Sequence, residues 1–184
     1  MLASICNAAF AQGVQKQPAK PASNQDSQKQ DNQKKDTPPV ELGRFDSFNA
    51  YMQEKNGARL CYLVAQPSKM EPANVRRDPV YFFVTHRPKD KIRNEISISA
   101  GYPFKVDAPA SLEITPSGGL FSLVTSGEGA WLSELTKQNI LIEALRKGRE
   151  VVMKGTSHRG TATSDTYSLS GFAGALDRIN QACQ

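Results

Sequence analysis

The chain has 184 residues, which is enough for one domain with an appendage. Its composition, 39% hydrophobic and 22% charged, is ordinary for a globular protein, and no apolar run approaches the roughly 18–20 residues of a membrane-spanning helix. The net charge of +5 is spread along the chain. We therefore expect no transmembrane segment and no nucleic-acid partner, because nucleic-acid binding needs a clustered basic surface.

The first residues are typical of the end of a secretory signal peptide. Ala9-Phe10-Ala11 is the small-residue pattern that signal peptidase accepts, with cleavage expected after Ala11. The stretch before it is short and lacks a basic start, so we interpret residues 1–11 as the remnant of a longer signal peptide. A random Ala-rich terminus is the alternative. The prediction is an exported protein, periplasmic, secreted or at the cell surface.

Residues 12–41 are expected to be a disordered tether. Seven Gln, five Lys and four Pro lie between Gln12 and Pro39, with no aromatic residue. Such a segment buries too little apolar surface to offset its ordering entropy. It would space a domain of residues 42–184 from an envelope structure, or be a tail with no structural role.

Two cysteines remain if Cys6 leaves with the signal peptide. An even number suits an oxidising compartment, where Cys61 and Cys183 would join the start of the domain to its last helix. Such a bond constrains the unfolded chain by about 4–5 kcal/mol. The alternative is two free buried thiols in a cytosolic protein. Two isolated cysteines form neither a CxxC redox centre nor a zinc site.

Short strand-like runs follow one another through the predicted domain. Alternation in residues 95–99 turns Ile96 and Ile98 to a core, whereas the continuously apolar run 80–84 predicts a strand covered on both faces. Pro116-Ser117-Gly118-Gly119 favours a hairpin turn. The predicted strands cover residues 59–65, 80–85, 95–100, 111–115, 120–125, 151–154 and 166–170, with a weaker one in 44–51.

Two segments are predicted to be helices. Residues 135–147 place an apolar stripe of Ile140, Leu141, Ala144 and Leu145 on one side, and Gly148 ends the helix. Ser170 is the expected cap of a terminal helix whose buried face carries Phe172, Leu176, Ile179 and Cys183. Seven or eight strands without βαβ alternation predict a mainly β fold, a β-sandwich with two short helices, one at the C-terminus.

The sequence contains no convincing catalytic motif. Ser157, His158 and Asp165 are the residue types of a nucleophile, base and acid, but adjacent Ser and His point apart in a strand or turn, and no GxSxG motif surrounds the serine. His86 is the only other histidine. We expect no enzyme activity, no metal and no cofactor, with a hydrolase that uses His158 or His86 as the weaker alternative.

Basic residues suggest a surface for an anionic partner of the envelope or a host surface. A solvated turn is the alternative interpretation of these basic residues, which we call the candidate contact patch. The loop 155–160 adds His158 and Arg159 as candidate contacts. Trp131 is expected in the core. The patch comprises Arg76, Arg77, Arg87, Lys89, Lys91 and Arg93.

Several motifs follow one another between about residue 42 and Cys183. They are Cys61-Tyr62-Leu63, Tyr81-Phe82-Phe83-Val84-Thr85-His86-Arg87-Pro88, Arg93-Asn94-Glu95-Ile96-Ser97, Ala100-Gly101-Tyr102-Pro103-Phe104-Lys105, Gly127-Glu128-Gly129-Ala130-Trp131, Lys154-Gly155-Thr156-Ser157-His158-Arg159-Gly160-Thr161 and Asp165-Thr166-Tyr167-Ser168-Leu169-Ser170-Gly171-Phe172. Together they resemble the invasion-associated locus B family of exported proteins of α-proteobacteria. The chain departs from the family in offering Phe48 or Tyr51 where members often carry Trp.

The resemblance implies an immunoglobulin-like sandwich, a signal peptide and a Cys61–Cys183 pair, and it supplies no catalytic residues. It also implies an exported, non-enzymatic binding module related to proteins linked to host-cell invasion. An envelope housekeeping or stress-protection role is the alternative. The sequence does not identify the partner or the oligomeric state.

Overall fold

A computed structural model describes residues 36–116 and 119–184. The predicted signal-peptide remnant and most of the predicted tether lie outside these residues. The described strands are β1 (Val40–Phe45), β2 (Phe48–Lys55), β3 (Ala58–Ala65), β4 (Lys69–Glu71), β5 (Tyr81–Arg87), β6 (Ile92–Ser99), β7 (Ala110–Thr115), β8 (Gly119–Ser126), β9 (Gly129–Leu132), β10 (Glu150–Thr156) and β11 (Ala162–Ser168). The helices are α1 (Gln138–Lys147) and α2 (Phe172–Ala182), with the short 3-10 turns η1 (Pro88–Asp90) and η2 (Leu135–Lys137).

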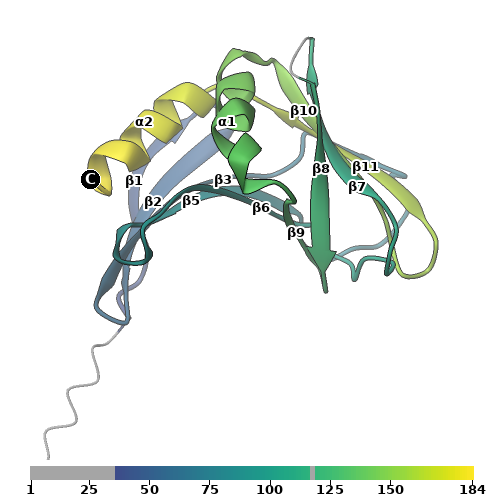
Figure 1. Cartoon of the computed structure of the whole chain (residues 1–184), viewed down its shortest axis with the longest axis horizontal. Coiled ribbons are helices and arrows are strands. Elements are labelled where there is room, and N and C mark those ends of the chain that lie inside the picture. The colour runs from purple at the N-terminus through teal and green to yellow at the C-terminus, as the bar shows by residue number, and fades with distance from the viewer. Residues whose placement is uncertain (1–35, 117–118) are drawn as a thin grey trace, which may run out of the picture. The chain divides into compact units, whose positions relative to one another are not determined.

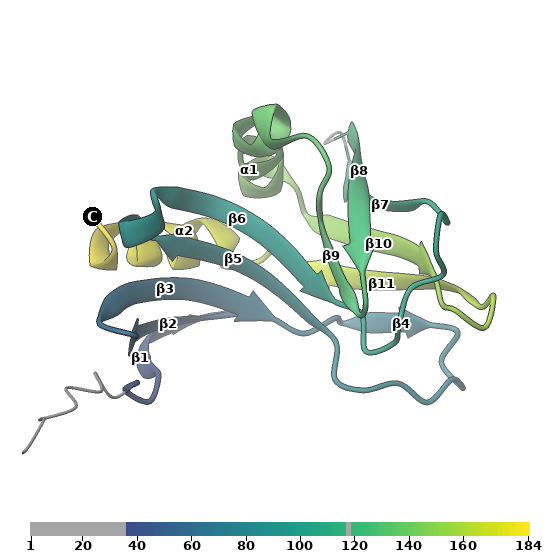
Figure 2. The same ribbon diagram turned by 60° about the horizontal axis from the view of Figure 1, so that its bottom comes forward.

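All strands belong to one antiparallel sheet in the order β1-β2-β3-β5-β6-β9-β8-β7-β10-β11-β4. The sheet bends back on itself (Figures 1 and 2). β3 is the third strand of the order and β4 is the last, yet only residues 66–68 connect them, so the edge that carries β4 must lie near β3. Phe82 of β5 accordingly packs against Tyr167 of β11, with ring centroids 5.6 Å apart. The mainly β fold with a C-terminal helix is confirmed, but there are more strands than predicted and they share one hydrogen-bonded sheet.

Both helices cover the same side of β2, β3, β5 and β6 (Figure 1). The predicted buried face of α2 is correct, since Phe172, Leu176 and Ile179 are buried. The predicted stripe of α1 is wrong at one position: Ile140 is 62% exposed, whereas the neighbouring Ile142 is buried. The helix therefore lies on the sheet through a face rotated from the predicted one.

Local details differ from prediction in several strands. The weak strand expected in residues 44–51 is instead part of a hairpin formed by β1 and β2. The turn between them includes Asp46, whose φ is +46°. The apolar run of β5 is not covered on both faces, because Phe82 and Val84 are buried while Tyr81 and Phe83 are half-buried. The strands β4 and β9 were not predicted.

Two further expectations for single residues are wrong. Ser170 does not cap α2, because its hydroxyl donates to the Asp46 carboxylate at 2.7 Å. The residue before the helix is Gly171, with φ of +83°, where a Cβ would lie 2.0 Å from the carbonyl oxygen of Phe45. Trp131 is half-buried on β9 rather than enclosed in the core.

Residues before position 42 already contact the sheet. β1 starts at Val40, and the backbone N–H of Thr37 donates to the carbonyl oxygen of Glu54 at 2.9 Å. The Asp36 side chain also accepts a hydrogen bond from the backbone of Asn56 at 2.8 Å. No helix among the described residues is long and apolar enough to cross a membrane.

Candidate functional site

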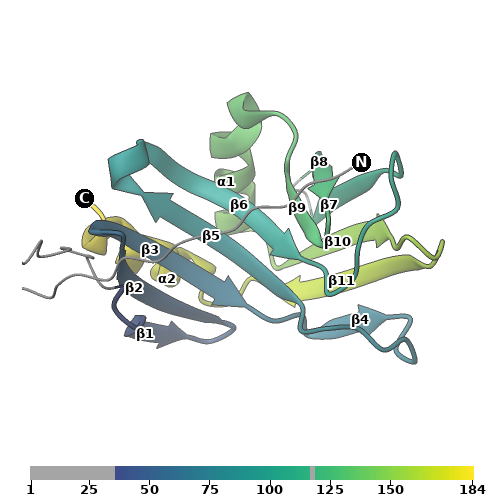
Figure 3. The same ribbon diagram turned by 90° about the horizontal axis from the view of Figure 1, so that it is seen from below.

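The structure separates the candidate contact patch into two groups. Arg76 and Arg77 lie beside the β10–β11 loop that carries His158 and Arg159. The β5–β6 turn with the other four basic residues lies at the opposite end of the sheet, near the C-terminus of the chain (Figures 2 and 3). A single basic surface made of all six predicted residues therefore does not exist in the described part of the chain.

The first group surrounds a cleft of about 310 Å³, which we call the loop cleft. Four loops and the start of β11 form it. Larger surface hollows of about 680 and 800 Å³ lie beside β4, but fewer buried polar side chains line them. Residues that line the loop cleft are Val75, Arg76, Arg77, Asp78, Gly101, Tyr102, Pro103, Glu128, Ser157, His158, Arg159, Thr161 and Thr163.

A buried ion pair supports the floor of the cleft. Arg77 donates from Nη1 to Oδ2 of Asp165 at 2.9 Å and from Nη2 to Oδ1 at 2.6 Å. The side chains of Arg77 and Asp165 are 4% and 0% exposed. Burial opposes the charge of Arg77, but the hydrogen bonds and charge of Asp165 hold the pKa of the guanidinium above its ordinary value. Arg77 is thus a structural group rather than an exposed contact.

Asp165 reaches this position through strand alternation. Thr163, Asp165 and Tyr167 occupy successive inward positions of β11 and are all buried. Burial raises the pKa of Asp165, although the hydrogen bonds and charge of Arg77 act in the opposite direction. The carboxylate therefore depends on its partner for its charge in the interior.

Tyr102 completes the floor. Its hydroxyl forms a 2.5 Å hydrogen bond with Oγ1 of Thr163, and the guanidinium of Arg77 lies 5.7 Å from the centroid of its ring. The preceding Gly101 has φ of +69°, and a Cβ there would lie 2.1 Å from the carbonyl oxygen of Asp78. Only glycine fits this close approach, which holds the two loops together.

The wall of the cleft has mixed charge. Arg76, His158 and Arg159 are exposed, and neither arginine forms an ion pair with any described residue. The acidic residues Asp78 and Glu128 line the same space. Acidic and basic groups are therefore balanced around the cleft, which favours a partner with both charges over a purely anionic surface.

The residue types of a hydrolase do not assemble here. Ser157 is buried and its Oγ accepts the backbone N–H of Thr161 at 3.2 Å, whereas the adjacent His158 is exposed. Both carboxylate oxygens of Asp165 are bound to Arg77. The three side chains do not form the hydrogen-bonded set that nucleophilic catalysis requires. Among the described residues no cluster of three His, Cys, Asp or Glu is placed to hold a metal ion.

The second basic group is largely engaged in contacts within the chain. Arg87 forms ion pairs with Glu95 and Asp90, and Arg93 donates from Nη2 to the carbonyl oxygen of Cys183 at 2.6 Å. Lys89 and Lys91 are exposed and form no ion pair within the described ranges. The turn therefore offers two lysines without ion pairs in the described residues, whereas its two arginines are held by contacts within the chain.

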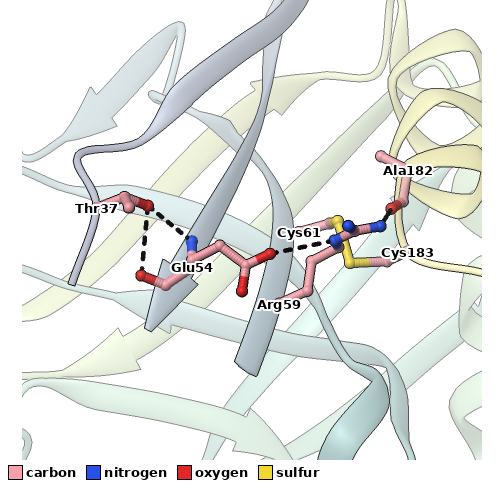
Figure 4. A network of polar contacts seen from close by, with 6 residues as sticks. All are labelled: Thr37, Glu54, Arg59, Cys61, Ala182 and Cys183. Carbon is pink, nitrogen blue, oxygen red and sulfur yellow. Dashed lines mark hydrogen bonds and ion pairs between the residues drawn. A yellow bond between two sulfur atoms is a disulfide. The ribbon is translucent and has the colours of Figure 1, made fainter. Parts of the chain in front are cut away.

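The disulfide lies at this end of the sheet. Cys61 and Cys183 are bonded, with their Cα atoms 6.0 Å apart, and both are fully buried. Arg59 donates from Nη1 to the carbonyl oxygen of Ala182 at 3.1 Å (Figure 4). Together with Arg93 it places positive charge at the C-terminal carbonyls of α2, which the helix dipole favours.

His86 is buried beside this anchor, on β5 opposite Cys61. Its Nδ1 accepts the backbone N–H of Asn94 at 3.0 Å, and its Nε2 lies 2.9 Å from Oδ1 of Asn180 in α2. A neutral ring with its proton on Nε2 satisfies both contacts, whereas a second proton on Nδ1 would face an N–H donor. Burial lowers the pKa of His86, and the charge of Arg93 acts in the same direction.

We expect the protein to lose stability as the pH falls below about 6.5, because the unfolded chain then binds a proton that folded His86 resists. His86→Gln should reduce this loss. His158→Ala, which removes the only other histidine and an exposed one, is the matched control and should retain it. Urea unfolding at about pH 7.5 and pH 5.5 measures the difference. An unchanged pH dependence in His86→Gln would contradict the prediction.

Fold and cleft together define a disulfide-bonded, mainly β domain whose polar cleft is built by loops. The chain belongs to the invasion associated locus B (IalB) protein family, whose model matches residues 50–180. It is similar in structure to invasion associated protein B from Bartonella henselae, with a TM-score of 0.56 and 15% identity over 78% of this chain and 96% of that one. Comparison with curated protein sequences gives no match.

Proposed function

We propose that this chain is an exported, non-enzymatic interaction module of the Gram-negative cell envelope or surface, and that its partner binds in the loop cleft. Membership of the IalB family supports export, and the joined Cys61 and Cys183 suit an oxidising compartment. The similar Bartonella protein is described as invasion associated, which supports a role at a surface.

The observation that carries the proposal is the way the cleft is built. A buried ion pair fixes its floor, while exposed charged side chains stand on its wall without partners in the described residues. The rigid floor suits recognition, because its ion-paired side chains lose little further conformational freedom when a partner binds, while the free polar groups of the wall can form new contacts. The balanced charges of the wall fit a protein segment that carries both acidic and basic side chains.

Site-specific photocrosslinking in cells tests the proposal. A photoreactive amino acid in place of Arg159 should capture one defined partner protein, whereas the same group in place of the exposed Glu143 of α1 should not. Adding Arg76→Ala should reduce the yield roughly fivefold to tenfold, as expected when an interface arginine is truncated.

The compartment is checked in the same cells by osmotic release of the periplasm. Release of the chain together with a periplasmic marker is the expected result. Equal crosslinking from positions 159 and 143, or a yield that Arg76→Ala does not change, would refute the proposed use of the cleft.

A further inference from the structure

A row of aromatic side chains crosses the side of the sheet opposite to the helices. Tyr51 of β2 stacks on Tyr62 of β3, with ring centroids 5.3 Å apart, and Tyr62 meets Phe83 of β5 edge to face at 6.2 Å. Tyr81 lies 5.8 Å from Phe83 along the same strand. Trp131 follows on β9, where its ring occupies the space that a Cβ on Gly129 would need. We call these five residues the aromatic face.

No described element covers the aromatic face. Both helices pack on the other side of β2, β3, β5 and β6, and Figure 3 looks onto the uncovered side. Strand alternation explains the placement, because the residues between the aromatic ones, such as Leu63 and Phe82, are buried in the core. Each of the five rings is half-buried, so each retains exposed surface.

Small uncharged polar side chains lie between the rings. Ser97 of β6 is the direct neighbour of both Phe83 and Trp131, and Ser99 is the neighbour of Tyr81. Asn49 and Gln53 lie on either side of Tyr51 along β2 and share its half-buried state, and Nε2 of Gln53 donates to the carbonyl oxygen of Thr37 at 2.8 Å. The surface thus alternates ring carbon with hydroxyl and amide groups, so apolar and hydrogen-bonding contacts are offered side by side.

Charged residues stand at the border of the aromatic face and are already paired. On one side Arg44 and Glu41 of β1 bind each other at 2.9 Å. On the other side Arg87 is bound to Glu95. Within residues 36–116 and 119–184, the centre of the face therefore offers no unpaired charge that would attract a charged partner, and an uncharged partner suits it best.

We propose that the aromatic face binds an uncharged glycan, a chain of linked pyranose rings. Each pyranose has apolar C–H surfaces that pack on aromatic rings, and hydroxyl groups that pair with serine, tyrosine and amide side chains. The ring centroids lie 5.3 and 6.2 Å apart across β2, β3 and β5, and 5.8 Å apart along β5, so a linked chain of sugars meets a continuous row of rings. This surface is distinct from the loop cleft, so the inference goes beyond the proposed function.

The single tryptophan allows a direct titration of the full chain. Cellohexaose and chitohexaose are each added while the fluorescence of Trp131 is recorded, and the two sugars distinguish a plain glucan from an N-acetylated glycan. A saturable change with at least one of them is expected. Tyr62→Ala and Phe83→Ala should each weaken binding about tenfold, which corresponds to the loss of one stacking contact.

Matched variants separate binding from folding. Tyr62→Phe retains the ring and should bind within about threefold of the wild type. Leu120→Ala on β8 removes an exposed apolar residue outside the face, and Arg159→Ala alters the loop cleft; both should bind normally. Urea unfolding of each variant verifies that it is folded. Absence of saturable binding to either sugar would overturn the proposal, as would equal binding by wild type, Tyr62→Ala and Phe83→Ala. If a photoreactive amino acid at position 62 captured a protein in cells, that protein would replace the glycan as the occupant.

Discussion

A variant with both Cys61 and Cys183 replaced by alanine is expected to lose about 4–5 kcal/mol of unfolding free energy. The disulfide joins residues 122 apart in sequence, so it removes a large share of the freedom of the unfolded chain. Alanine is the appropriate replacement because both cysteines are fully buried and serine would bury a new hydroxyl group. Urea unfolding followed by circular dichroism measures the change.

The same bond fixes the last helix, so its loss should be visible locally. Without it, α2 is held at its end by the carbonyl contacts of Arg59 and Arg93. Hydrogen exchange in α2 should therefore accelerate more than exchange in β10 and β11. Wild-type protein refolded under reducing conditions is the control and should behave like the double alanine variant. Identical unfolding midpoints for oxidised and reduced wild type would contradict the assigned role of the bond.

Local sequence patterns predicted the elements whose shape they determine directly. The terminal helix follows from Phe172, Leu176 and Ile179 at helical spacing, and β6 follows from the strict alternation around Ile96 and Ile98. The strands β4 and β9 escaped prediction because they have only three and four residues: β4 pairs with the distant β11, and β9 joins its neighbour β8 to the distant β6. The bend that unites the strands into one sheet likewise depends on contacts that no local pattern encodes.

The loop cleft itself was not predicted. Arg76, Arg77, His158 and Arg159 were named as candidate contacts, but nothing in the sequence indicated that they meet. Nor did it indicate that Asp78, Tyr102 and Glu128 complete the cleft. A signal for its floor was present: Asp165 shares the inward positions of β11 with Tyr167, which marks a buried acid in need of a partner. Its partner lies 88 residues earlier, and only the fold reveals which arginine it is.

Loss of Arg77, the partner of Asp165, is the second change for which we expect a large effect on stability. Arg77→Met is expected to destabilise the protein by about 3–5 kcal/mol, because it leaves the carboxylate of Asp165 buried without its counter-charge. Arg44→Met is the matched control: Arg44 also pairs with an acid, Glu41, but both side chains are exposed, so its loss should leave the unfolding free energy nearly unchanged. Urea unfolding of both variants provides the comparison.

The pH dependence of Arg77→Met distinguishes an uncompensated charge from lost packing. Burial already raises the pKa of Asp165, and removal of Arg77 should raise it further. The folded variant then takes up a proton at a higher pH than the unfolded chain, so its deficit should shrink as the pH falls from about 7 towards 4.

A cavity left by the guanidinium would instead produce the same deficit at every pH. Adding Asp165→Leu to Arg77→Met removes the buried charge, so the double variant should recover part of the lost stability at neutral pH. If the double variant were less stable than Arg77→Met alone, and the deficit of Arg77→Met did not vary with pH, the ion pair would act through shape rather than charge.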